Sequence, residues 1–163
     1  EMIEARWLFG VEMDCVKVVV HPQSVVHSLV EYVDGSMIAQ MSTPDMCLPI
    51  QYALTHPERM ANQRVQTNLA SIGTLQFEEP DSERFPALDL ARRAGEVCGT
   101  LPAVFNAANE LEVYAFCEAK LSLLGITKLV SDVMDQHQVI THPDLSQILE
   151  SDQWARRHAT VLI

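Results

Sequence analysis

The spacing of apolar residues changes midway along the chain. In the second half, apolar residues recur every three or four positions, which is the period of an amphipathic helix. Segments with this period predict helices at 86–97, 102–119, 126–137, 143–150 and 153–162. Asp152 is the expected N-cap between the last two, because an aspartate can accept a hydrogen bond from a free amide in the first helical turn. We therefore predict a helical bundle over residues 83–163.

The first half predicts a mixture of helices and strands. Residues 1–9 are apolar on nearly every side, which indicates a buried helix that stops at Gly10. Residues 16–20, Val-Lys-Val-Val-Val, form a short β-branched run that is typical of an interior strand. Residues 45–55 predict a helix with Pro49 in its first turn, where proline is tolerated.

A β-hairpin is the clearest short-range signal in this half. Residues 27–33 and 36–41 are strand-like and flank Asp34-Gly35. Asp-Gly between two such runs favours a tight hairpin turn, since that turn needs residues that adopt positive φ angles. Neither strand alternates cleanly between apolar and polar residues, so we expect both faces of the hairpin to contact other groups.

These elements together predict an α+β fold in three parts. Residues 1–57 form a partial α/β domain with a hairpin-containing sheet, and residues 58–82 form a connector dominated by Asn, Gln, Thr and Ser. Residues 83–163 form the all-α bundle. The chain opens on Glu1 directly into a helical pattern, so we expect it to be a piece of something longer.

Charge narrows the range of partners. The chain carries 11 basic and 22 acidic side chains, for a formal net charge of -11. Long-range attraction to nucleic acid or to an anionic membrane is therefore not expected. No apolar run approaches the length of roughly 20 residues that a membrane-spanning helix needs. An anionic substrate could bind only through local hydrogen-bond donors or a metal ion.

The cysteines favour a structural explanation over a redox one. The chain has 4 cysteines, none in a Cys-x-x-Cys spacing, and each lies among apolar neighbours. We predict free, buried thiols in a reducing compartment. A zinc site or a disulfide pair is the alternative.

Few residues indicate chemistry by their pattern alone. Glu1 and Glu4 lie one helical turn apart, which is most simply explained by the preference of acids for the start of a helix. A metal site there needs further ligands from outside this chain, because Mg²⁺ and Mn²⁺ require several oxygen donors. His27 is either a structural histidine or a proton donor, and Met46 is either packing or a pocket wall. The chain has no phosphate-binding glycine-rich motif and no nucleophile motif.

Several segments, in order along the chain, resemble one enzyme family. They are Glu-Met-Ile-Glu-Ala-Arg-Trp-Leu-Phe at 1–9, His-Pro-Gln-Ser-Val-Val-His-Ser at 21–28, Asp-Gly-Ser at 34–36, Pro-Asp-Met at 44–46, Pro-Ile-Gln-Tyr-Ala at 49–53 and Asn-Ala-Ala-Asn-Glu at 106–110. Together they are similar to the C-terminal part of the 1-deoxy-D-xylulose 5-phosphate reductoisomerases. The resemblance runs over essentially the whole chain and implies that residues 1–57 are the end of the catalytic domain.

The resemblance implies a specific reaction and a set of site residues. The family rearranges and reduces its phosphorylated ketose to 2-C-methyl-D-erythritol 4-phosphate, in the non-mevalonate route to isoprenoids, with NADPH and a divalent metal, Mg²⁺ or Mn²⁺. By position, Glu1 matches a metal-ligand carboxylate that also contacts substrate, and Glu4 is expected to support it. His27 matches an active-site histidine, while Pro44 and Met46 match the substrate pocket wall.

The resemblance also implies what this chain lacks. The NADPH-binding domain, the Asp-x-Glu metal pair, the active-site lid and the phosphate-binding residues all fall outside it. We therefore expect the isolated chain to be inactive and to bind neither cofactor tightly. The family implies a homodimer in the bacterial cytoplasm, with a plastid as the alternative location. The competing interpretation is a non-catalytic module for dimerisation or scaffolding.

Overall fold

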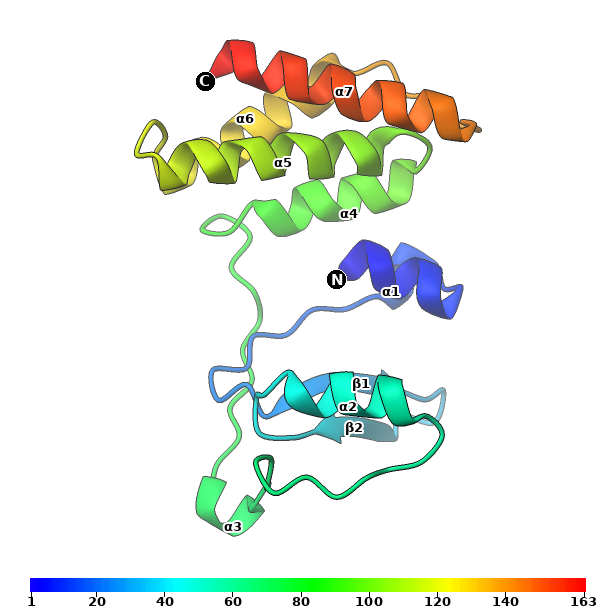
Figure 1. Ribbon diagram of the computed structural model, residues 1–163, viewed down its shortest axis with the longest axis vertical. Coiled ribbons are helices and arrows are strands. Elements are labelled where there is room, and N and C mark those ends of the chain that lie inside the picture. Colours follow the sequence, from blue (N-terminus) through cyan, green and yellow to red (C-terminus); the bar gives the residue numbers. More distant parts are fainter. The chain divides into compact units, whose positions relative to one another are not determined.

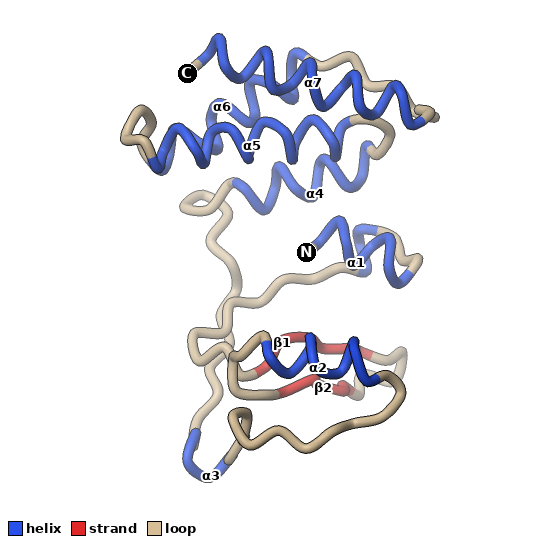
Figure 2. Tube along the Cα trace, viewed as in Figure 1, coloured by secondary structure: helices blue, strands red, loops and turns tan.

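The computed structural model describes residues 1–163 and shows the α+β fold that the sequence predicts (Figure 1). The elements of the first half are α1 (Met2–Phe9), the 3-10 turn η1 (Met13–Cys15), β1 (Val26–Glu31), β2 (Met37–Met41), α2 (Cys47–Thr55) and the short α3 (Leu69–Ile72). The second half is entirely helical, as Figure 2 shows, with α4 (Ala87–Val97), α5 (Leu101–Cys117), α6 (Leu123–Gln136) and α7 (Leu145–Leu162). No helix is both long enough and apolar enough to cross a membrane.

The chain forms two compact units. One contains Glu1–Val18 together with Asp81–Ile163, and the other contains Val19–Pro80. This division differs from the boundaries predicted at residues 57 and 82, because α1 and η1 pack with the C-terminal helices. We call the first the helical unit and the second the hairpin unit.

The helical unit is built around α5, which packs against α4, α6 and α7. Its core consists of side chains at helical spacing on these elements: Ala94, Leu101, Val104, Ala107, Ala108, Ile126, Val130, Val133, Met134, Ala155 and Ala159. Many are alanines, so the helix axes can approach closely without leaving cavities. The predicted all-α bundle in the C-terminal half is confirmed, and α1 packs with it.

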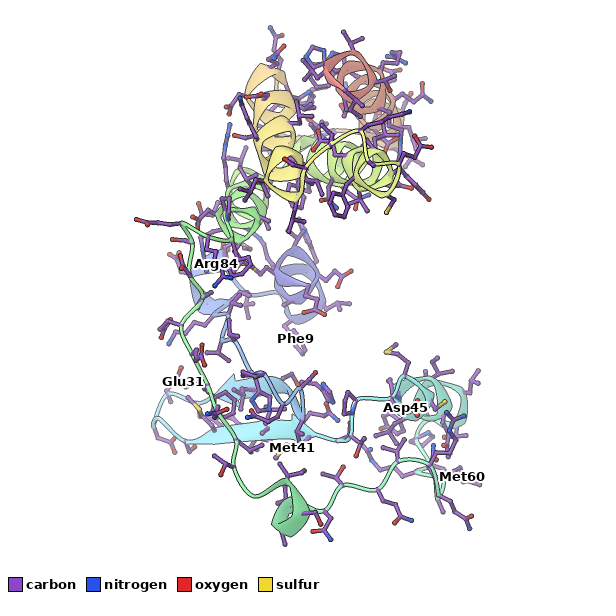
Figure 3. All side chains as sticks on the ribbon, turned by 90° about the vertical axis from the view of Figure 1, so that its left-hand side faces the viewer. Phe9, Glu31, Met41, Asp45, Met60 and Arg84 are labelled. Carbon is purple, nitrogen blue, oxygen red and sulfur yellow. The ribbon has the colours of Figure 1, made fainter.

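Helix α1 is less buried than its sequence predicts. Met2 is buried and Ile3 packs against the bundle core. Trp7, Leu8 and Phe9, however, are 67%, 81% and 75% exposed, and Figure 3 shows Phe9 projecting from α1 away from the bundle helices. The prediction of a helix buried on all sides is therefore wrong, because the bundle covers only one side of α1.

The last helix is also longer than predicted. Residues 145–162 form one continuous helix instead of two. Its N-cap is Asp144, which accepts a hydrogen bond from the backbone N–H of Gln147, while the Gln147 side chain accepts one from the backbone N–H of Asp144. Asp152 is not a cap, because it lies in mid-helix and pairs with Arg156 one turn later. No residue between 150 and 153 breaks helices, so polarity alone does not interrupt α7.

The hairpin unit contains a two-stranded antiparallel sheet, which confirms the hairpin predicted at Asp34-Gly35. Asp34 accepts hydrogen bonds from the backbone N–H and the hydroxyl of Ser36, and Gly35 adopts a φ of 82° that glycine tolerates. These hydrogen bonds hold the pKa of Asp34 below its usual value. The pairing register of β1 with β2 shifts between Val26 and Ser28, so a β-bulge lies at His27.

The predicted strand at 16–20 does not form. Only Val20 pairs, as an isolated antiparallel bridge to Glu78. A β-branched run becomes a strand only where a neighbouring backbone is aligned to pair with it, and residues 16–19 lie outside any strand of the structure. Helix α2 ends at Thr55, as predicted, and the segment 58–82 is mostly irregular.

The cysteines depart in part from the prediction. All four are free, but Cys15 and Cys117 are exposed, so the prediction of buried thiols is wrong for these two. No group of three or more His, Cys, Asp or Glu side chains could hold a metal ion by itself. The structure therefore gives no support to the zinc alternative.

Candidate functional site

Glu1 and Glu4 lie at the first turn of α1, in the helical unit. The carbonyl oxygen of Glu1 accepts the backbone N–H of Ala5 at 2.8 Å, which places Glu1 at the N-cap position. Neither carboxylate is covered, since the side chains of Glu1 and Glu4 are 106% and 74% exposed. The two carboxylates therefore present hard oxygen donors to solvent, the type that Mg²⁺ and Mn²⁺ prefer, although two residues supply too few of them for a complete site.

His27 lies at the start of the hairpin, in the hairpin unit. Its Nε2 is within hydrogen-bonding distance of Ser42 through both the hydroxyl, at 3.1 Å, and the carbonyl oxygen, at 3.2 Å. Ser42 is buried, and its backbone N–H donates to the carbonyl of Val25. Ser42 thus fixes the orientation of the imidazole, which lies at the β-bulge. The ring remains exposed and open to a ligand.

The Pro44–Met46 loop joins β2 to α2. Asp45 accepts a hydrogen bond from the backbone N–H of Cys47 at 2.8 Å and pairs with Arg64 at 3.5 Å. The amide of Cys47, with a smaller contribution from Arg64, holds the pKa of Asp45 below its usual value. Asp45 in turn raises the pKa of the Cys47 thiol. Met46, the next residue, is 70% exposed.

The 60–67 segment supports this loop from the other side. Thr43 donates its backbone N–H to the Thr67 hydroxyl and its own hydroxyl to the carbonyl of Gln66. Asn62 donates to the side chain of Gln51 on α2. Figure 3 shows Asp45 and Met60 close to α2, displaced from the hairpin strands. The irregular connector therefore shapes the predicted pocket wall.

His21 has a structural role. Its Nδ1 is 2.7 Å from the carbonyl oxygen of Gln76, and its ring stacks on Phe77 with centroids 4.6 Å apart. Gln23 and Gln76 exchange two further hydrogen bonds. The His-Pro-Gln-Ser loop is thus held against the segment around residue 76.

The predicted site residues fall into two groups. Glu1 and Glu4 belong to the helical unit, whereas His27, Pro44 and Met46 belong to the hairpin unit. Within each unit, the elements described above determine how each side chain is presented. The assignment of these residues to metal and substrate stays a prediction.

Sequence reasoning missed one buried acid. Glu112 on α5 is fully buried, and neither of its carboxylate oxygens makes a hydrogen bond. Burial raises the pKa of Glu112 to about 8, the nearby backbone of Val130 opposes the shift, and the charge of Asp132 adds to it. Glu112 lies four residues after Ala108 and three before Ala115, so a charged residue at an apolar position was the available signal.

A cleft of about 630 Å³ lies at the end of α6 and along the first half of α7. His137, Trp154 and Arg157 are among the side chains that line it. Burial lowers the pKa of His137, whose Nε2 is 2.7 Å from the Thr100 hydroxyl. None of the predicted site residues lines this cleft, so it is separate from the candidate site.

Comparison with known proteins identifies relatives along the whole chain. A family model described as the DXP reductoisomerase C-terminal domain matches residues 41–158. The 1-deoxy-D-xylulose 5-phosphate reductoisomerase of Pelotomaculum thermopropionicum is 53% identical over 163 residues, which are 100% of this chain and 42% of the relative. That of Desulforamulus reducens is 52% identical over the same shares.

Solved structures agree with the sequence comparison. The Zymomonas mobilis reductoisomerase in complex with NADPH superposes with a TM-score of 0.91 at 42% identity, over 99% of this chain and 43% of that structure. A reductoisomerase in complex with NADPH, fosmidomycin and magnesium superposes with a TM-score of 0.87 at 39% identity, over 98% and 41%. The chain thus spans about two-fifths of the length of the proteins that it matches.

Proposed function

Because this chain belongs to the 1-deoxy-D-xylulose 5-phosphate reductoisomerase family, as its C-terminal part, we propose that it supplies part of the active site of such an enzyme. The whole enzyme would convert 1-deoxy-D-xylulose 5-phosphate to 2-C-methyl-D-erythritol 4-phosphate, in isoprenoid biosynthesis. The observation that carries this proposal is the match along 100% of the chain at 53% identity. The NADPH and magnesium complexes of the relatives support both cofactors for the intact protein.

Glu1 is the proposed metal ligand of this chain. Its fully exposed carboxylate at the start of α1 has the donor chemistry that Mg²⁺ and Mn²⁺ require. When bound, the metal would polarise substrate oxygens as a Lewis acid. Glu4, one turn later, adds a second negative charge that favours a cation near Glu1. The remaining ligands would come from outside this chain.

The hairpin unit supplies the proposed substrate contacts. His27, held through Nε2 by Ser42, would orient a polar group of the substrate or hold a proton at the ring. Pro44 and Met46 would cover the carbon atoms of the substrate, since Met46 is exposed on the anchored Pro44–Met46 loop. Their role is to position the substrate and exclude water rather than to react with it.

The isolated chain is proposed to be inactive, because a site with too few metal ligands and no dinucleotide-binding motif cannot complete the reaction. Purified chain mixed with 1-deoxy-D-xylulose 5-phosphate, NADPH and Mn²⁺ should leave absorbance at 340 nm constant. Substrate-dependent oxidation of NADPH in that mixture would contradict this part of the proposal.

The proposal for Glu1 is tested in the full-length protein that contains this chain. Glu1→Gln keeps the shape of the side chain but removes its charge, so kcat/KM should fall by at least about a hundredfold, as for loss of a group that acts on the transition state. Glu83→Gln removes an exposed charge from the linker before α4 and is the matched control. Equal activity of both variants would rule out a metal-ligand role for Glu1.

A second role, association through the hairpin, is favoured by its exposed apolar side chains. Leu29 and Val30 of β1 are 40% and 50% exposed, and Met37 and Ile38 of β2 are 59% and 60% exposed. Exposed apolar strands usually mark a contact surface. We propose that this hairpin contributes to a homodimer of the whole enzyme. Sedimentation of an Ile38→Lys variant should then show a shift toward monomer, and an unchanged dimer would exclude the contact.

A further inference from the structure

We propose that Arg92, on α4 in the C-terminal bundle, is a positioning residue for Glu1. Arg92 holds the η1 segment, which follows α1 in the chain, and thereby sets where the Glu1 carboxylate lies. The inference rests on the proposed function, because it assumes that Glu1 binds the metal. It assigns to α4 a part in metal binding, although no residue of α4 is a proposed metal ligand.

Arg92 makes two hydrogen bonds to backbone carbonyls, one on the first residue of η1 and one on the residue that follows η1. Its Nη1 donates to the carbonyl oxygen of Met13 at 3.1 Å, and its Nη2 donates to that of Val16 at 3.2 Å. These carbonyls are 79 and 76 residues away in sequence. A guanidinium presents its donors in a rigid fork, so it can bridge two carbonyl oxygens at once, which the single ammonium of lysine cannot do in the same geometry.

The neighbouring turn of α4 adds a second attachment. Arg6 on α1 donates from Nη1 to the carbonyl oxygen of Gly95 at 2.5 Å and pairs through Nη2 with Glu12 at 3.1 Å. Gly95 is buried, and a Cβ at this position would lie 2.6 Å from Sδ of Met13. Met13 is only 2% exposed, so it has little room to move. The backbone of α4 therefore lies directly against the η1 segment.

The constraint at η1 reaches Glu1 through a short rigid helix. The chain turns at Gly10, in the left-handed conformation, where the N–H of Val11 bonds to the carbonyl of Arg6. From there α1 runs back over 8 residues, a length of roughly 12 Å, to Glu1. At that end Met2 is buried and Ile3 packs against the bundle core. Loss of the Arg92 fork should therefore displace or tilt α1 without unfolding it.

Arg93, the next residue, provides a matched control. It also lies on α4, but its Nη1 pairs with Asp135 on α6 at 2.5 Å. Substitution of Arg93 thus removes the same kind of side chain and weakens a contact within the bundle. It leaves the contacts between α4 and η1 in place.

The test uses the full-length protein and Mn²⁺ alone, with binding followed by the loss of the electron paramagnetic resonance signal of free Mn²⁺. Arg92→Ala should raise the Kd for Mn²⁺ about tenfold, the lower end of the loss seen when a residue that orients a ligand is removed. Arg92→Lys should recover only part of the affinity, because it restores the charge but not the fork. Arg93→Ala should bind Mn²⁺ like the unmodified protein. If Arg92→Ala fails to fold, Arg92→Lys alone decides the matter.

Glu1→Gln separates the two proposals. Weak Mn²⁺ binding by Glu1→Gln together with unchanged binding by Arg92→Ala and Arg92→Lys would overturn the positioning role and leave the proposed function intact. Equal losses for the Arg92 and Arg93 variants would also overturn it, because general loosening of the bundle would then account for both. Unchanged Mn²⁺ binding by Glu1→Gln would overturn the metal role itself and the inference with it.

Discussion

Replacement of Glu112 by glutamine should stabilise the helical unit, and the gain should grow with pH. Glu112 is fully buried on α5 with both carboxylate oxygens unpartnered, which is among the most unfavourable arrangements for an ionised group. Glutamine has nearly the same shape but cannot ionise. The change therefore tests the charge while the packing around it stays nearly constant.

The size of the effect follows from the raised pKa. Glu112 titrates at an ordinary value of 4.5 when unfolded and at about 8 when folded. Between these values the folded chain holds a proton that the unfolded chain has lost, so stability falls as pH rises, by about 1.4 kcal/mol per pH unit. At pH 7 the raised pKa of Glu112 lowers the free energy of unfolding by at most about 3 kcal/mol, which is a large share of the stability of a domain. Above the folded pKa the cost becomes constant.

Urea unfolding of the 163-residue chain, followed by circular dichroism at 222 nm, measures this difference. The free energy of unfolding of Glu112→Gln minus that of the unmodified chain should be near zero at about pH 4.5. It should rise steadily and level off above about pH 8. Glu110→Gln is the matched control, because Glu110 is exposed and paired with Arg156, so its removal should cost only a few tenths of a kcal/mol.

A flat difference between Glu112→Gln and the unmodified chain would refute the reasoning. So would a difference that grows as pH falls, since the ionised form would then be the one that the fold prefers. A gain of similar size in Glu110→Gln would show that net charge, rather than burial of Glu112, controls the stability.

Three further perturbations test other parts of the fold. Asp144→Ala should lower the stability of α7 by about 1 kcal/mol in thermal melting, whereas Asp152→Ala should cost only about 0.5 kcal/mol, because Asp144 caps the helix and Asp152 makes an exposed pair one turn away. Gly95→Ala should destabilise the helical unit by about 1 kcal/mol in urea unfolding, because the overlap of its methyl group with the buried Met13 side chain outweighs the gain in helix propensity; a stabilised variant would contradict the close approach. His137→Gln should reduce the loss of stability on acidification below about pH 6.5, because burial lowers the pKa of His137 and the folded state therefore resists its protonation; identical acid sensitivity in both proteins would contradict this.

The candidate site shows how far pattern and resemblance can reach. Resemblance indicated Glu1 and His27, because ordered sequence segments are specific to a family even when a single residue is not. It could not show that Ser42 orients the His27 ring, since that contact depends on the bulge and the register of the hairpin. It also passed over Arg92, whose partners are carbonyl groups that have no sequence signature.

The sequence by itself determined the local elements. Helices α4, α5 and α6, the hairpin at Asp34-Gly35 and the end of α2 before His56-Pro57 all follow from periodicity and turn chemistry within a few neighbouring residues. Only the tertiary structure decided which surfaces of those elements are covered. It joined α1 to the C-terminal bundle, left Trp7 exposed and left residues 16–19 outside any strand. It also buried Glu112 with no hydrogen-bond partner for its carboxylate. Burial and pairing depend on contacts between residues far apart in the chain, and local sequence pattern carries little information about those contacts.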